Sequence, residues 1–197
     1  MKNSIQDLGL VALMAVLLGV FTVPGKAQVL PEKESVLEKM RLANAYFMKK
    51  WPDVGKTIIT NKERASNIWT RAVYYEGLMA LYGIDPQPEY YNYAERWADF
   101  HKWDLRDGDT YTRNADNQCA GQTYIDLYLI DPQPERIKYI KASIDSMMNT
   151  SKIDDWSWID AIQMGLPVFA QLGVIYKDEA YFERMYEMYK FTKEEHG

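Results

Sequence analysis

The sequence has little of what most cofactor and metal sites require. It contains a single cysteine, Cys119, and two histidines, His101 and His196, so neither an internal disulfide nor a set of spaced metal ligands is present. It also lacks a P-loop, a dinucleotide-binding fingerprint and a G-x-S-x-G nucleophile elbow. We therefore expect neither a metal ion nor an organic cofactor.

Positive charge is also scarce, because 23 Lys and Arg residues face 28 Asp and Glu residues. This acidic balance argues against nucleic acid and an anionic membrane surface as partners. The single long apolar run, Leu8 to Val23, follows Lys2 and precedes small residues at Gly25 and Ala27. It predicts a signal peptide over residues 1–27 that is cleaved after Ala27, and export to the periplasm or the medium. No later segment is apolar enough to span a membrane after processing, and residues 28–197 are expected to form one domain.

Aromatic residues are abundant, at 14% of the chain, with six Trp and fifteen Tyr. They can fill a core or line a carbohydrate site, and composition alone favours the core.

A repeat organises the chain. The hexapeptide Ile-Asp-Pro-Gln-Pro-Glu occurs at residues 84–89 and again at 130–135, an offset of 46 residues, and a weaker third copy follows near Leu172. Such a period indicates stacked helical hairpins. Pro86 and Pro132 should each end a helix, and Pro88 and Pro134 suit the first turn of the next.

The predicted helices are of two kinds. Residues 67–83 and 158–173 are apolar nearly all round, whereas residues 89–103, 135–148 and 178–193 are amphipathic; residues 116–130 are intermediate. Their alternation predicts an all-α fold in which an inner ring of helices is wrapped by an outer ring. Pro167 lies within an inner helix and should kink it. We count about seven helices where a closed α/α toroid needs roughly twelve, so we expect a truncated copy of such a barrel.

The repeat also locates the starts of the inner helices. Trp69, Asp116 and Asp160 lie at nearly equivalent positions, 14 or 15 residues before the turns. Each aspartate can be a structural N-cap, and Asn114 is a competing cap beside Asp116. Asp160 lies between aromatics in Trp-Ser-Trp-Ile-Asp-Ala, where we expect it to be buried. Burial raises the pKa of a carboxyl group, as general acid catalysis near neutral pH requires.

Other candidates are less specific. Trp156 and Trp158 could stack on a sugar ring or belong to the core, and Arg71, Gln118 and Gln122 could bind a substrate or have ordinary structural roles. His101 is expected to be structural.

Three segments resemble glycoside hydrolase family 105, the unsaturated rhamnogalacturonyl hydrolases, which are related to the unsaturated glucuronyl hydrolases of family 88. They are residues 67–82, residues 114–124 with Ala-Asp-Asn-Gln, and residues 156–170 with Trp-x-Trp-x-Asp-Ala. The resemblance extends from about Val36 to Gly197, and it implies a six-hairpin α/α barrel. It also implies an oligosaccharide substrate, left by a pectin or similar lyase, with an unsaturated uronic acid at its non-reducing end.

By this resemblance, Asp160 is the general acid and base that protonates C4 while water adds at C5, and Asp116 holds the substrate and tunes its partner. Trp69, Trp156, Trp158, Arg71, Gln118 and Gln122 are the candidate substrate-binding residues. Full members of the family continue through about five more helices. Two other functions stay open: a helical-repeat binding module, and another α/α-barrel enzyme that degrades polysaccharides, such as a lyase.

Overall fold

A computed structural model of the chain describes residues 30–196. The predicted signal segment, including Leu8–Val23 and Ala27, lies outside the described residues. The chain divides into two compact units, residues 1–39 and 40–197. In the first, the described residues hold the beginning of helix α2 (Lys33–Lys50), where the Val36 amide donates to the Glu32 carbonyl over 3.1 Å. All further description concerns residues 40–197.

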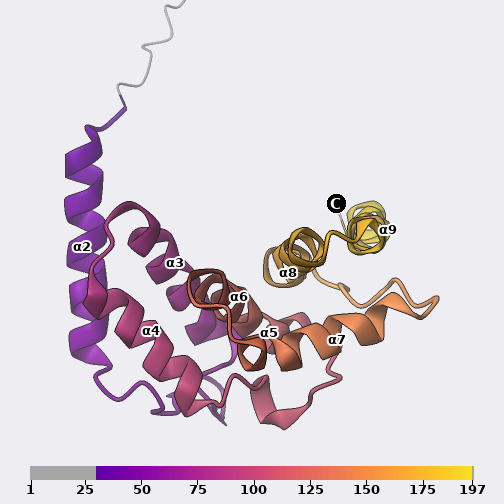
Figure 1. Cartoon of the computed structure of the whole chain (residues 1–197), viewed down its shortest axis with the longest axis horizontal. Helices are drawn as coiled ribbons and strands as arrows, with labels where there is room; N and C mark the ends of the chain where they lie inside the picture. The colour runs from indigo at the N-terminus through magenta and orange to yellow at the C-terminus, as the bar shows by residue number, and fades with distance from the viewer. Residues whose placement is uncertain (1–29, 197) are drawn as a thin grey trace, which may run out of the picture. The chain divides into compact units, whose positions relative to one another are not determined.

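The second unit is almost entirely helical, as Figure 1 shows. After the rest of α2 come a short hairpin of β1 (Ile58–Ile59) and β2 (Glu63–Arg64), then helices α3 to α9 with two 3₁₀ turns between them. Their bounds are α3 Trp69–Ile84, α4 Pro88–Phe100, η1 Arg106–Gly108, α5 Ala115–Gln118, α6 Ala120–Ile130, η2 Pro134–Arg136, α7 Lys138–Met148, α8 Ala161–Tyr176 and α9 Glu179–His196. Helices α5 and α6 meet at Cys119, whose backbone is also helical. The all-α prediction is confirmed, whereas the hairpin was not predicted.

The 46-residue period is exact in the inner helices. Their first residues are Trp69, Ala115 and Ala161, and their last residues are Ile84, Ile130 and Tyr176. Helix α6 packs between α3 and α8, while α4 lies against α3 and α9 against α8 (Figure 1). Inner and outer helices therefore alternate as the repeat predicted.

The repeated hexapeptide forms the same turn twice. The side-chain amide of Gln87 donates to the Asp85 carboxylate over 2.9 Å, and that of Gln133 donates to the Asp131 carboxylate over 2.5 Å. Pro88 is the first residue of α4 and Pro134 the first of η2, as expected from proline's fixed φ and missing N–H. An arginine binds each aspartate: Arg41 contacts Asp85, and Arg136 contacts Asp131.

Several of the large aromatic side chains fill the core. Tyr75 of α3 stacks on Trp97 of α4 with ring centroids 3.9 Å apart, and it also packs on Tyr93. Tyr124 and Trp156 are fully buried too. For these residues, the prediction that aromatic side chains fill the core is confirmed.

The inner helices are not covered on every side in the part of the chain that the structure describes. Val73 of α3, Leu129 of α6 and Val174 of α8 are 40%, 57% and 68% exposed. An apolar surface nearly all round therefore does not mean burial on every side here: Val73 lines a hollow beside α2, and Leu129 lines another between α3 and α6. None of the described helices is long and apolar enough to cross a membrane.

Pro167 lies inside α8, and the helix continues past it to Tyr176. Proline has no N–H, so the carbonyl of Gln163, four residues earlier, loses its helical donor. The side-chain amide of Gln122 on α6 donates to this carbonyl over 2.9 Å, and also to that of Met164 over 3.2 Å. Gln122, predicted to bind substrate, thus has a structural task in the described chain.

Candidate active site

Three helix starts meet at one end of the inner layer, which we call the rim. Trp69 is the first residue of α3, Asp116 is the second residue of α5, and Asp160 immediately precedes α8. Helix α5 packs against both α3 and α8. The rim therefore carries the near-equivalent positions that the repeat identified.

Asp116 does not cap its own helix. The side chain of Asn114 accepts a hydrogen bond from the Asp116 amide over 2.8 Å and serves as the cap. The carboxyl of Asp116 is thus left for another task, and it is half-buried.

The Asp116 carboxyl also interacts with its neighbour across the rim. Its pKa is raised, first by burial and then by the negative charge of Asp160, against the lowering influence of Arg106 and Arg64. The two predicted aspartates are therefore close enough to interact electrostatically.

Asp160 differs from the sequence expectation. It occupies the N-cap position of α8, but its side chain makes no capping hydrogen bond, and it makes no ion pair with any described residue. Its side chain is exposed, so the prediction of a carboxylate buried between aromatics is wrong. The physical reason is that the neighbouring side chains do not enclose it: the Trp156 ring packs into the core, and Ile159 is itself 58% exposed.

The three predicted tryptophans have different environments. Trp156 is fully buried, edge-on to Phe169 with centroids 5.8 Å apart, so it offers no face to a ligand in this structure. Trp158 is partly exposed two residues before Asp160, and Trp69 is 36% exposed at the start of α3. Only Trp69 and Trp158 of this set are therefore accessible near the rim.

Two predicted polar contacts are used within the fold. The guanidinium of Arg71 is buried and lies over the Trp51 ring, 4.1 Å from its centroid. The Gln118 amide is fully buried and donates to the Thr112 carbonyl over 3.1 Å and to the Ser143 hydroxyl over 3.0 Å. Both side chains support the packing around the rim.

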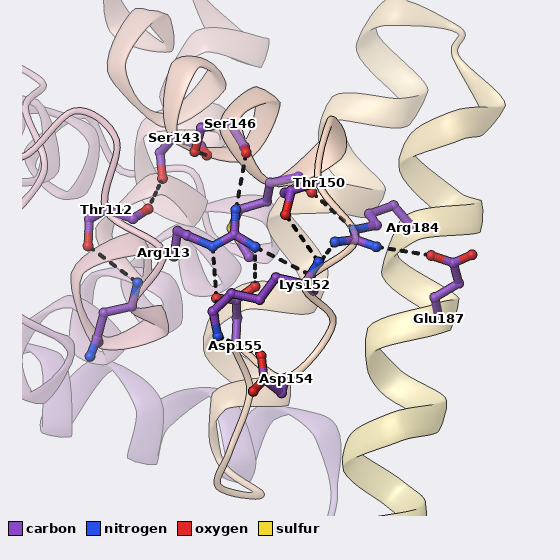
Figure 2. Close-up of polar contacts among 12 residues, drawn as sticks. Thr112, Arg113, Ser143, Ser146, Thr150, Lys152, Asp154, Asp155, Arg184 and Glu187 are labelled. Carbon is purple, nitrogen blue, oxygen red and sulfur yellow. Dashed lines mark hydrogen bonds and ion pairs between the residues drawn. The ribbon is translucent and has the colours of Figure 1, made fainter.

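An ion pair joins the two segments that carry the aspartates, as Figure 2 shows. Arg113, just before α5, donates from Nε to Asp155 Oδ1 over 2.9 Å and from Nη2 to Oδ2 over 2.5 Å. The Asp155 side chain is only 3% exposed. The bidentate geometry fixes the loop before α8 relative to the start of α5.

The same loop is held from its other side by α9. Arg184 donates to the carbonyls of Met147 and Lys152, and Lys152 Nζ lies 2.6 Å from Asp154 Oδ1 (Figure 2). The loop therefore has a defined path from α7 to Asp160.

Two acidic residues that the sequence analysis missed lie on the inner helices. Glu76 of α3 accepts hydrogen bonds from the Cys119 thiol over 2.9 Å and from the Gln163 amide over 2.7 Å, and burial raises its pKa. Asp126 of α6 accepts from Gln171 over 2.9 Å, and burial, together with the charge of Glu76, raises its pKa to about 6. Each is a lone carboxylate in an apolar helix, a signal that could have identified it.

Glu76 and Asp126 line a hollow of about 410 Å³ between α3 and α6. A hollow of about 700 Å³ lies elsewhere, between the loop after α7 and α9, and neither rim aspartate lines it. We place the candidate site at the rim because the interacting carboxyls lie there.

His101 ends α4 away from these groups. Its Nε2 lies 2.7 Å from the Ser66 hydroxyl, and burial lowers its pKa to about 4. Among the described residues, no group of His, Cys, Asp and Glu side chains is arranged to hold a metal ion.

Comparisons with known proteins bear on the family and the fold of the chain. The profile described as Glycosyl Hydrolase Family 88 matches residues 39–196. A solved glycosyl hydrolase family 88 protein from Bacteroides vulgatus is 25% identical with a TM-score of 0.72, covering 83% of this chain and 48% of its own. A structure described as a polysaccharide lyase is 26% identical with a TM-score of 0.71, covering 80% of this chain and 46% of its own. No curated protein matches the chain.

The chain spans just under half the length of these two structures. The matched region nevertheless contains every described inner helix and both rim aspartates. Family 88 is also a relative of family 105, which the sequence resembles. The chain belongs to glycosyl hydrolase family 88.

Proposed function

We propose that the rim is the catalytic end of a glycosidase that hydrates the C4=C5 double bond of an unsaturated uronyl residue at the non-reducing end of an oligosaccharide. The observation that carries the proposal is the electrostatically interacting pair of Asp116 and Asp160 at neighbouring helix starts. In this proposal, Asp160 is the general acid and base, and Asp116 holds the substrate and tunes its partner.

The proposed reaction needs only one carboxyl group for both proton transfers. Asp160, in its acid form, donates a proton to C4, and positive charge develops at C5 beside the ring oxygen. Water then adds at C5 and returns a proton to the Asp160 carboxylate, so the net change is addition of one water molecule. The resulting hemiketal opens to a ketone, and the hemiacetal left at C1 releases the neighbouring sugar.

The exposed position of Asp160 suits a group that must reach a ligand. A sugar ring bound over the rim would displace water from this carboxyl and favour its protonated form. Trp158 and Trp69, both accessible beside the pair, are the proposed stacking surfaces for that ring. General acid–base catalysis of this kind contributes about 10²–10⁴-fold in rate.

A polysaccharide lyase is the second candidate, because one similar structure is described as one. A lyase removes the proton at C5 of an intact uronate and creates the double bond that the hydrolase consumes. The two reactions therefore change the same chromophore in opposite directions.

The ultraviolet absorbance of the enoate tests both candidates. The chain is incubated with oligosaccharides from a rhamnogalacturonan-lyase digest and, separately, with the intact polymer. We expect absorbance to fall with the digest and to stay constant with the polymer. A rise on intact polymer would instead identify a lyase, and no change with either substrate would contradict the proposed hydrolase.

A further inference from the structure

Glu76 occupies a central position below the rim. It is the eighth residue of α3, and its two carboxylate oxygens contact two different elements: Oε1 accepts from Cys119, at the junction of α5 and α6, and Oε2 accepts from Gln163 of α8. Through this one carboxylate, α3 is hydrogen-bonded to both of the helices that carry the rim aspartates.

The two donors lie on the same helix faces as the two aspartates. Cys119 follows Asp116 by three residues, and Gln163 follows Asp160 by three residues. Side chains three residues apart lie on one face of a helix, one turn apart. Glu76 therefore lies one turn below the aspartate pair and between the two helices that hold it.

We propose that Glu76 is a positioning residue for the aspartate pair: by accepting hydrogen bonds from Cys119 and Gln163, it fixes the distance between the Asp116 and Asp160 carboxyl groups. The proposal deepens the proposed function, on which its relevance to catalysis rests. The distance itself is a property of the free chain and does not depend on turnover.

The interaction between the two carboxyl groups can be measured directly. The measured quantity is the amount by which Asp160→Asn lowers the pKa of Asp116, obtained by carbon-detected NMR titration of the full chain. The other charged groups that act on Asp116 are Arg64 on the hairpin and Arg106 in η1, and both stay unchanged throughout. Because Coulomb energy falls with distance, a wider spacing reduces this difference.

Three variants separate position from charge. Gln163→Ala removes one donor at an exposed side chain, so it leaves no cavity. Glu76→Leu removes both acceptor oxygens. Glu76→Gln is the matched control: its oxygen can accept from Cys119, and a flipped Gln163 amide can accept from its nitrogen, so both links persist without the charge.

We expect the Asp160→Asn effect on the Asp116 pKa to fall by about half or more in Gln163→Ala and in Glu76→Leu, and to persist in Glu76→Gln. If Glu76→Leu does not fold, Gln163→Ala decides the matter. An unchanged effect in Gln163→Ala would overturn the proposal, and so would the absence of any effect of Asp160→Asn in the otherwise unaltered chain. Because no substrate is used, these outcomes are independent of a failure of the enoate assay.

Discussion

Arg113 donates a hydrogen bond to each carboxylate oxygen of Asp155. This largely buried ion pair links the segment before Asp116 to the loop before Asp160. Arg113 precedes Asp116 by three positions, and Asp155 precedes Asp160 by five. The arrangement of the rim thus depends on a contact between side chains 42 residues apart.

The first prediction concerns this pair. Asp155→Ala leaves the Arg113 guanidinium without its carboxylate in a largely buried setting, so we expect the free energy of unfolding to fall by about 3–5 kcal/mol. Denaturant titration monitored by circular dichroism measures this change. Asp154→Ala, on the same loop but with an exposed partner in Lys152, should cost no more than about 1 kcal/mol. Equal losses in the two variants would show that the Arg113 contact has no special weight.

The second prediction links Gln122 to Pro167. Gln122→Ala leaves the Gln163 carbonyl without a donor and should destabilise the fold by about 1–3 kcal/mol. In a Pro167→Ala background, residue 167 regains an N–H that can donate to this carbonyl, so the same Gln122→Ala change should cost less. A double-mutant cycle of unfolding free energies measures the difference. A coupling energy of zero would contradict the structural role assigned to Gln122.

The third prediction concerns the stability of the fold with pH. The pKa of Asp126 is raised from 3.8 to about 6, mainly by burial. Its favourable contribution to folding is therefore complete below pH 3.8 and is lost as the pH rises through about 6. Asp126→Asn keeps the acceptor for Gln171 and removes the charge.

We expect Asp126→Asn to match the unaltered chain in stability near pH 3.8 and to exceed it at pH 8. The gain at pH 8 is at most about 3 kcal/mol, and less because Asp126 is partly exposed. Denaturant titrations of both proteins at the two pH values test this, with Asp109→Asn on an exposed loop as the control. A difference that is the same at both pH values would rule out titration of Asp126 as its cause.

The sequence predicted the features that follow from local and repeated patterns. The 46-residue period located the inner-helix starts to within one residue of Trp69, Asp116 and Asp160, and Asn114 was recognised as a competing cap. These features depend on backbone geometry near the residue itself, and residue types report that geometry directly.

The environment of each side chain was less accessible to prediction. Trp156 and Trp158 belong to the same short motif, yet one is fully buried and the other partly exposed. The loop that carries both rings is tied to the start of α5 by the Arg113–Asp155 contact, and the local sequence pattern does not reveal a contact between residues so far apart.

Glu76 was missed for a related reason. A lone carboxylate in an apolar helix signals a special environment, but its partners, Cys119 and Gln163, lie 43 and 87 residues away in the chain. Only the packing of α3 and α8 against α5 and α6 brings the three residues together.

The central claim is that the rim aspartates perform the proposed chemistry, and Asp160→Asn tests it most directly. The variant keeps the size of the side chain and removes its ability to exchange a proton. The rate of enoate loss on lyase-generated oligosaccharides is compared for the unaltered chain, Asp160→Asn and the matched loop control Asp154→Asn. We predict a loss of at least about 10²-fold for Asp160→Asn with an unchanged thermal unfolding midpoint, and near-normal turnover for Asp154→Asn. Enoate loss by Asp160→Asn at the rate of the unaltered chain would contradict the account.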